Sequence, residues 1–206
     1  MTNTGNKITS DELRKHIRHI IVISLDACAA GHLGCYGYHR QTSPNLDELA
    51  HDGIRLSQFF CEYPNTAVNF RLMMISRYPE MNEHWATFPQ MRKGNSRNLP
   101  EYFKDAGFAT ASFSGNSFYG PNHGYKDGWD TFETAKEMAG HLRANVITDM
   151  SIHWLDQRNP EQERILLWAH YLEPHNPYHA PAPWDHMFAQ EYPVCPSADG
   201  KGEFLP

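Results

Sequence analysis

The stretch Ile20-Ile21-Val22-Ile23-Ser24-Leu25, followed by Asp26, decides how the rest of the chain is interpreted. It is β-branched and nearly all apolar, which is typical of a strand buried on both faces of a parallel sheet. The carboxylate of Asp26 would then lie at the carboxyl edge of the sheet, where ligand sites form in open α/β folds. The alternative is that Asp26 only caps the turn that follows it.

Helix-like and strand-like segments alternate after this first strand. Helices are predicted from Pro44 to a stop at Gly53, over Val68–Ile75, from Asn98 to Gly107 and over residues 134–157, and strands over Ile54–Phe60, Phe108–Phe113 and Arg164–Leu172. The longest helix is predicted to bury a stripe made by Met138, Leu142, Val146, Met150 and Trp154. The alternation predicts an α/β fold with a mainly parallel sheet and helices on both of its faces.

Composition excludes several classes of partner. The 206 residues carry a net charge of −6 without a run of Lys or Arg, which argues against binding to nucleic acid. The four cysteines (Cys28, Cys35, Cys61 and Cys195) show neither the pairing of a zinc site nor the density of a disulfide scaffold. Neither a signal-like segment nor a membrane-spanning run is visible. We therefore expect a soluble, cytoplasmic protein without a membrane partner, and the oligomeric state stays open.

Several phrases occur in a specific order: Leu25-Asp26, His32 to Tyr38 (HLGCYGY), Thr42 to Ala50 (TSPNLDELA) and Gly53. Together they resemble the opening of the sulfatase family, in the alkaline-phosphatase superfamily. Leu99–Thr110 and Trp168–Tyr178 look like later family segments, so the resemblance covers about residues 19–180. It implies an alkaline-phosphatase-like α/β domain over 19–180, the N-terminal part of a fold that is C-terminally incomplete. An N-terminal extension (1–18) precedes this domain, and a Pro-rich irregular tail (181–206) follows it.

The resemblance also points to a nucleophile. Family members carry it at the start of a helix, often as a cysteine that is converted to formylglycine, ahead of a Gly-Arg-Tyr-Pro phrase. Counting back from Arg77-Tyr78-Pro79 puts Thr66 at that position, so formylglycine chemistry is disfavoured. A hydroxyl bound to a divalent cation loses its proton more easily, which makes Thr66 a competent substitute. The alternative is that Thr66 is a simple helix cap.

The resemblance implies supporting roles for further residues. Asn69 completes a Thr-x-x-Asn arrangement similar to that of nucleotide pyrophosphatase/phosphodiesterases and is expected to donate a hydrogen bond to the transferring group. His175 stands in the place of the family's Asp-Pro-His phrase and is the candidate general acid. His170 and Arg71 are candidates for substrate binding. A histidine in an apolar strand is, however, more often a core residue, and the family's arginine falls at Phe70.

Asp26 and Thr66 are the candidate metal ligands, and the implied cofactor is a divalent cation, either calcium, magnesium, manganese or zinc. Ala27 stands where members often have a second aspartate, and no later segment matches the family's Asp-His ligands, so the site is predicted to be incomplete. The expected function is metal-dependent hydrolysis of a small sulfate or phosphate ester, with little activity from these residues alone. The alternatives are a phosphodiesterase or phosphoryl-group transferase with a Thr nucleophile, and a non-catalytic remnant.

Overall fold

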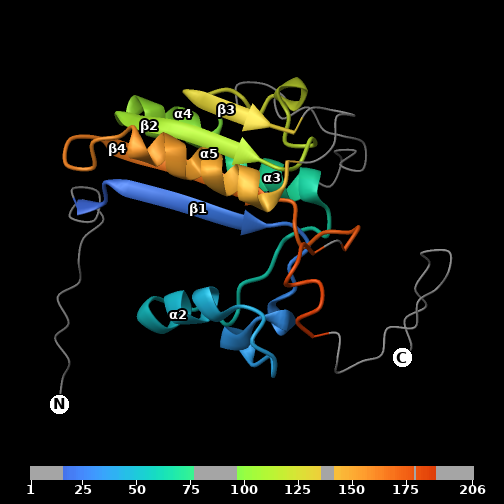
Figure 1. Cartoon of the computed structure of the whole chain (residues 1–206). Helices are drawn as coiled ribbons and strands as arrows, with labels where there is room; N and C mark the ends of the chain where they lie inside the picture. Colours follow the sequence, from blue (N-terminus) through green and yellow to red (C-terminus); the bar gives the residue numbers. More distant parts are fainter. Residues whose placement is uncertain (1–15, 77–96, 136–141, 179, 189–206) are drawn as a thin grey trace, which may run out of the picture. The chain divides into compact units, whose positions relative to one another are not determined.

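One parallel sheet organises the described part of the chain. The structure is a computed structural model and describes residues 16–76, 97–135, 142–178 and 180–188. The strands lie in the spatial order β1-β4-β2-β3, and each neighbouring pair is parallel (Figure 1). They are β1 (His19–Leu25), β2 (Phe108–Ser114), β3 (Thr131–Thr134) and β4 (Arg164–Tyr171). The helices are α2 (Pro44–Asp52), α3 (Thr66–Ile75), α4 (Leu99–Asp105) and α5 (Ala144–Asp156), with short 3-10 turns η1 (Ala30–His32), η2 (Gly34–Tyr36) and η3 (Pro121–His123). The predicted α/β class with a mainly parallel sheet is confirmed.

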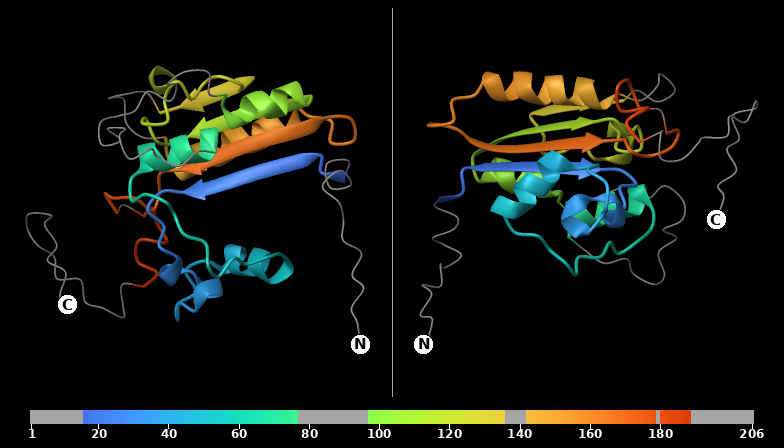
Figure 2. Two further views of the ribbon diagram at one scale, coloured as in Figure 1. Left: turned by 180° about the vertical axis from the view of Figure 1, so that it is seen from behind. Right: turned by 60° about the horizontal axis from the view of Figure 1, so that its bottom comes forward.

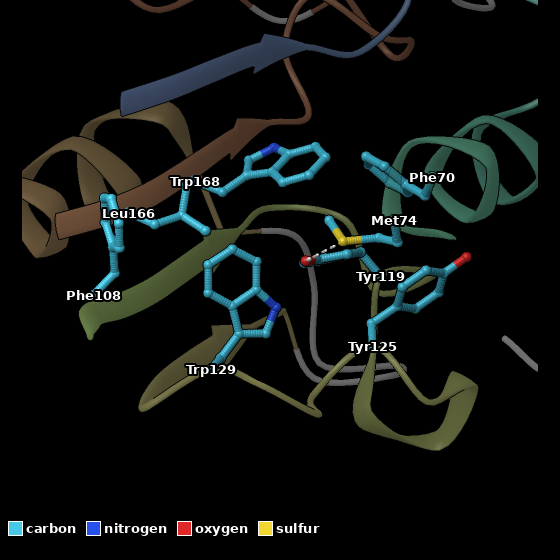
Figure 3. Close-up of a cluster of buried hydrophobic side chains, with 8 residues drawn as sticks. All are labelled: Phe70, Met74, Phe108, Tyr119, Tyr125, Trp129, Leu166 and Trp168. Atoms are coloured by element: carbon cyan, nitrogen blue, oxygen red, sulfur yellow. Dashed lines mark hydrogen bonds between the residues drawn. The ribbon is translucent and has the colours of Figure 1, made fainter. Parts of the chain in front are cut away.

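Helices pack on both faces of the sheet (Figure 1; Figure 2). On one face, Ile147 and Trp154 of α5 pack against alternate residues of β4, Ile165 and Leu167. On the other face, α3 and α4 cover an aromatic cluster. Its buried members are Phe70, Met74, Phe108, Tyr119, Tyr125, Trp129, Leu166 and Trp168 (Figure 3). Both faces of β4 are therefore covered, which explains why its sequence is a nearly continuous apolar run.

The pairing register sets up the carboxyl edge of the sheet. Ser24 of β1 pairs with His170 of β4, and His170 pairs with Ser114 of β2. Because side chains alternate with a period of two, these three residues point to one face, and the residues two positions later point to the same face. Those later positions are Asp26 after β1 and Asn116 after β2.

The first strand, β1, is an edge strand with one exposed face, so the prediction that it is buried on both faces is wrong. Ile20 and Val22 pack against the aromatic cluster, whereas Ile21 and Ile23 are 52% and 57% exposed. An apolar, β-branched run predicts that a strand forms. It does not show whether neighbours cover both of its faces.

The predicted strand over Ile54–Phe60 is also wrong. The segment is irregular, and Ile54 and Phe59 are 90% and 79% exposed. Alternating residues stabilise a strand only where a neighbouring strand can accept their backbone hydrogen bonds. The strands that the structure describes pair among themselves in the four-stranded order given above, and this segment is not among them.

The segment around α2 is held by its own polar contacts. The N–H of Gly34 donates to Ser43 Oγ at 2.9 Å, and the N–H of Cys35 donates to Asp47 Oδ1 at 2.7 Å. Ser43 Oγ also donates to Asp47 Oδ1 at 2.9 Å. A Cβ on Gly34 would collide with the Asp47 carboxylate. Two of the family-like phrases, HLGCYGY and TSPNLDELA, therefore contact each other and stabilise this local fold.

The helix predicted over 134–157 begins later than expected. It starts at Ala144, and the short strand β3 occupies Thr131–Thr134 at the position where the helix was expected to begin. Of the predicted stripe, Trp154 is buried and Leu142 and Met150 pack against the core, whereas Val146 is exposed and its neighbour Ile147 is buried in its place. Met138, the first residue of that stripe, lies outside the described residues. The buried residue is Ile147 rather than Val146 because Ile147 lies on the face of the helix that packs against the sheet.

The chain divides into two units, Met1–Pro174 and His175–Pro206, and each is considered by itself. All of the elements above belong to the first unit. The second unit is irregular over residues 175–178 and 180–188. Residues 1–15 of the predicted extension and 189–206 of the predicted tail lie outside the described residues, as does the Arg77-Tyr78-Pro79 phrase. Within the described ranges, the helices lack the length and hydropathy that a membrane span requires.

Candidate functional site

Asp26 and Asn116 are placed at the carboxyl edge by backbone bonds that extend the sheet beyond its strands. The N–H of Asp26 donates to the carbonyl of Tyr171 at 2.9 Å, and the N–H of Gly115 donates to the carbonyl of His170 at 2.9 Å. Directly after Asp26, Ala27 adopts a left-handed conformation with φ of 55°, so the chain turns sharply there. The predicted position of Asp26 at a strand exit is thus observed, whereas the next helical turn is preceded by Ala29 rather than capped by Asp26.

The carboxylate of Asp26 is the centre of a polar cluster. Asn116 Nδ2 donates to Asp26 Oδ2 at 2.8 Å, and Thr66 Oγ1 donates to Oδ1 at 3.2 Å. His170 Nε2 lies 3.7 Å from Oδ2. The side chain of Asp26 is only 9% exposed and that of His170 is 3% exposed, so these contacts are little screened by solvent.

Thr66 is the first residue of α3 and is free of the capping role that was its alternative interpretation. The cap is Asn65, whose side chain accepts from the N–H of Ala67 at 3.1 Å and from the N–H of Val68 at 3.3 Å. The Thr66 hydroxyl is directed to Asp26 instead. Asn65 thus occupies two of the N–H groups in the first turn of α3, which are then not available to an anion.

The other two α3 candidates do not contact Asp26 through any interaction described. Asn69 holds the preceding loop: its Oδ1 accepts from the N–H of Tyr63 at 3.3 Å, and its Nδ2 donates to the Tyr63 carbonyl. Arg71 is a buried residue of α3 and is 6% exposed. Burial raises the pKa of Tyr125 above its ordinary range, and the positive charge of Arg71 opposes that rise. The catalytic role predicted for Asn69 and the substrate-binding role predicted for Arg71 stay predictions.

The two histidine candidates occupy different units of the chain. His170 lies on β4, beneath Asp26, and its ring meets the Phe70 ring edge to face at 4.6 Å between centroids. His175 is exposed in the second unit, where its Nδ1 lies 2.7 Å from the carbonyl oxygen of Asn176. Its assignment as the general acid stays a prediction.

Asn116 is a site residue that the sequence analysis missed. It is 4% exposed, and the orientation of its amide is defined because Oδ1 accepts from the N–H of Phe118 at 2.9 Å. Nδ2 therefore faces Asp26 as a donor. The available signal was its place just beyond a strand: Asn116 lies two residues after the end of Phe108–Ser114, and Asp26 directly follows His19–Leu25.

The cluster supplies only part of a metal site. Asp26 and Thr66 offer the oxygen atoms that hard cations prefer. Asn116, however, presents N–H groups to the cluster, and its oxygen is already bound by Phe118. In the ranges that the structure describes, His, Cys, Asp and Glu side chains do not gather in any group of three or more that could hold a metal ion. The described residues therefore supply two candidate ligands, Asp26 and Thr66, and whether the site is complete stays a prediction.

Comparison with known proteins gives this site a family context. Iduronate 2-sulfatase of Mus musculus is 23% identical over 199 residues, which cover 77% of this chain and 35% of that protein. Human arylsulfatase A is 45% identical over 61 residues, which cover 30% of this chain and 12% of that protein. This chain spans about a third of the length of the iduronate sulfatases that it matches.

Solved structures agree on the fold. BT4656, in complex with its substrate D-glucosamine-2-N,6-O-disulfate, matches with a TM-score of 0.68 at 18% identity, covering 86% of this chain and 38% of that one. A protein of the alkaline phosphatase superfamily from Vibrio parahaemolyticus matches with a TM-score of 0.61 at 14% identity, covering 81% and 43% of the two chains. The family model for sulfatases matches residues 18–201, and this chain therefore belongs to the sulfatase family.

Proposed function

We propose that the protein containing this chain hydrolyses small sulfate or phosphate esters and that Thr66 is its nucleophile. The observation that carries the proposal is the hydrogen bond from Thr66 to Asp26 at the carboxyl edge of the sheet. A hydroxyl that is not needed to cap its helix, and that donates to a nearly buried carboxylate, is in the arrangement that nucleophilic catalysis requires.

The proposed reaction has two steps. Thr66 Oγ1 attacks the sulfur or phosphorus atom, the bond from that atom to the leaving oxygen breaks, and the hydroxyl proton leaves toward Asp26 Oδ1. A general acid, for which His175 is the candidate, protonates the leaving alcohol. Water then attacks the sulfuryl or phosphoryl group on Thr66 and gives a proton to the general acid, the bond from that group to Oγ1 breaks, and Asp26 returns its proton to Oγ1, which releases sulfate or phosphate and restores the hydroxyl. Asn116 Nδ2 donates to the same carboxylate that Thr66 contacts, and we propose that this amide also stabilises negative charge that develops in the reaction.

We also propose that the reaction depends on a divalent cation held partly by Asp26 and Thr66. Such a cation lowers the pKa of a bound hydroxyl and polarises the ester oxygen. Its remaining ligands would come from residues other than those described, and we accordingly expect little turnover from the 206 residues alone. Sulfated sugars are the first substrates to test, because iduronate 2-sulfatase and the substrate of BT4656 both point to this class.

A phosphodiesterase or phosphoryl-group transferase is the second candidate, and the hydroxyl of Thr66 is what favours it. A threonine alkoxide suits transfer to phosphorus as well as to sulfur. Formylglycine is made from a cysteine at the nucleophile position, and that position is occupied by Thr66.

A panel of sulfate monoesters, phosphate monoesters and phosphate diesters separates these functions. It should be measured with a longer protein that contains this chain, with and without added divalent cation, for the wild type, Thr66→Ala and Thr66→Ser. Sulfate ester hydrolysis that is lost in Thr66→Ala supports the first proposal, and preference for a phosphate diester supports the second. If wild type and Thr66→Ala are equally inactive with every substrate and cation, the protein is a non-catalytic remnant.

A further inference from the structure

We propose that His170 is a positioning residue, held in the Nε2-protonated tautomer by Ser24 and Trp168, and that it orients the carboxylate of Asp26. The tautomer rests on geometry alone. Its meaning for catalysis rests on the function proposed above.

A chain of hydrogen bonds fixes the proton on His170. Trp168 Nε1, which can only donate, lies 2.8 Å from Ser24 Oγ, and Ser24 Oγ lies 2.8 Å from His170 Nδ1. For the neutral imidazole, two arrangements of protons are possible. Either the Ser24 hydroxyl donates to Nδ1, or Nδ1 carries the proton and donates to Ser24.

The first arrangement pairs the indole N–H of Trp168 and the hydroxyl hydrogen of Ser24, and it leaves the Nε2–H of His170 in electrostatic contact with Asp26 rather than in a hydrogen bond. Ser24 accepts from Trp168 and spends its single hydrogen on His170, and the imidazole proton then lies on Nε2, directed to Asp26 Oδ2 at 3.7 Å. In the second arrangement the Ser24 hydrogen has no acceptor among the contacts described for it, and a lone pair of Nε2 faces the carboxylate. Unpaired polar groups are costly in a buried site, and the second arrangement leaves more of them. The first arrangement is therefore favoured in free energy.

The ring of His170 has little freedom to choose otherwise. It is 2% exposed, it is clamped at Nδ1 by Ser24, and the ring of Phe70 meets it edge to face. Trp168, at the start of the relay, is itself part of the buried aromatic cluster (Figure 3). The hydrogen bonds from Trp168 to Ser24 and from Ser24 to His170 therefore connect the His170 ring to the buried core and restrict its orientation. Hydrogen bonds outside a site commonly orient the residues that bind or react in this way.

The effect falls on one oxygen of Asp26. Oδ2 accepts from Asn116 at 2.8 Å and faces His170, whereas Oδ1 is the atom nearer to Thr66, at 3.2 Å against 3.5 Å for Oδ2. A separation of 3.7 Å is an electrostatic contact rather than a hydrogen bond, so His170 directs the carboxylate without competing with Asn116. In this proposal His170 supports the carboxylate of Asp26, and the substrate-binding role predicted for His170 from the sequence stays a prediction.

The test is the tautomer itself, read from long-range proton–nitrogen correlation NMR of the full 206-residue chain labelled with nitrogen-15. The His170 signals are assigned by their loss in His170→Gln. We expect one ring nitrogen, Nε2, to be protonated and Nδ1 to be unprotonated. An Nδ1-protonated ring, or a mixture of the two tautomers in comparable amounts, would overturn the proposal whether or not the protein is an enzyme.

Ser24→Ala tests the cause. It removes the donor to Nδ1, and we expect the exclusive Nε2-protonated pattern to be lost. Ser151→Ala is the matched control, because Ser151 is a buried serine of α5 whose hydroxyl donates to the carbonyl of Ile147. An unchanged His170 pattern in Ser24→Ala would show that Ser24 does not set the tautomer, and a change in Ser151→Ala would show that the effect is not local.

Discussion

The hydroxyl of Thr66 donates to the carboxylate of Asp26 at 3.2 Å, although 40 positions separate the two residues in the chain. One begins a buried helix and the other follows an edge strand, so the contact exists only when the sheet and α3 are both in place. Because Asn65 performs the capping of α3, the helix does not need this contact in order to form. The pair can therefore be altered for chemistry while the fold is kept.

Replacing Thr66 with Ala should abolish ester hydrolysis by a longer, active protein, with a loss in kcat on the order of 10³-fold or more. The free energy of unfolding should fall by only about 1 kcal/mol, because one partly buried hydrogen bond is lost. Steady-state kinetics and urea unfolding on the same preparation give both numbers. Thr66→Ser keeps the hydroxyl and is the control, and an alanine variant as active as the serine variant would move the chemistry to another residue.

Replacing Asn65 with Ala should have the opposite profile. The cap accepts from two N–H groups of α3, and its loss should lower the free energy of unfolding by about 1 kcal/mol, within a range of roughly 0.5 to 2. The Thr66 hydroxyl remains, so activity of a longer protein should persist. Asn65→Asp retains a side-chain oxygen and adds a favourable charge at the helix N-terminus, and it should keep the stability. A stable Asn65→Ala protein would mean that another group caps the helix.

Local patterns predicted most of this architecture, and the failures have a common cause. Asp26 was found because a strand exit is visible in a few adjacent residues, and Thr66 because the family resemblance, counted back from Arg77-Tyr78-Pro79, put it at the nucleophile position at a helix start. Asn116 was missed because its importance comes from the register between β2 and β4, which brings residues far apart in sequence into one row. The strand prediction for Ile54–Phe60 was wrong for the same reason, because an alternating sequence pattern does not show whether a neighbouring strand is available for pairing.

Three glycines should rank in a definite order when each is replaced by Ala. Gly128 has φ of 92° and its Cβ would collide with the backbone of Glu101, so Gly128→Ala should destabilise most. Gly107 has φ of 80° with open space around it, and a left-handed alanine costs about 1 kcal/mol. Gly31 has neither restriction and should be nearly neutral. Chemical denaturation of the three variants checks the ranking, and a Gly128→Ala protein as stable as Gly31→Ala would contradict it.

Hard cations should leave the melting temperature of the 206-residue chain nearly unchanged. Ligands that bind the native state raise stability by mass action, so a complete site would respond to calcium, magnesium or manganese. Asp26 and Thr66 are two ligands only, and their affinity should be weak. Differential scanning fluorimetry at millimolar cation measures this, with Asp26→Ala as the control. A saturable rise that disappears in Asp26→Ala would show that further ligands lie within these residues.

The carboxylate of Asp130 should make stability depend on pH in the acid range. Partial burial alone would raise its pKa, but the hydrogen bonds from Lys104, at 2.6 Å, and from the N–H of Thr110, at 3.0 Å, hold the pKa below the ordinary value. The unfolded chain therefore binds the proton more readily than the folded one, and stability falls as the pH falls. The contribution is fully present above the ordinary pKa of aspartate, about 4, and is lost as the pH falls through the lower folded value.

Asp130→Asn removes this titration and keeps the shape of the side chain. It should be less stable than the wild type near neutral pH, and the difference should shrink as the pH is lowered from about 6 to about 3, which urea unfolding at several pH values measures. Lys104→Met should reduce the pH dependence without abolishing it, because the bond from Thr110 remains, and added salt should weaken the part that Lys104 supplies, since both side chains are partly exposed. A stability difference between wild type and Asp130→Asn that stays constant across this range would show that folding does not lower the pKa of Asp130.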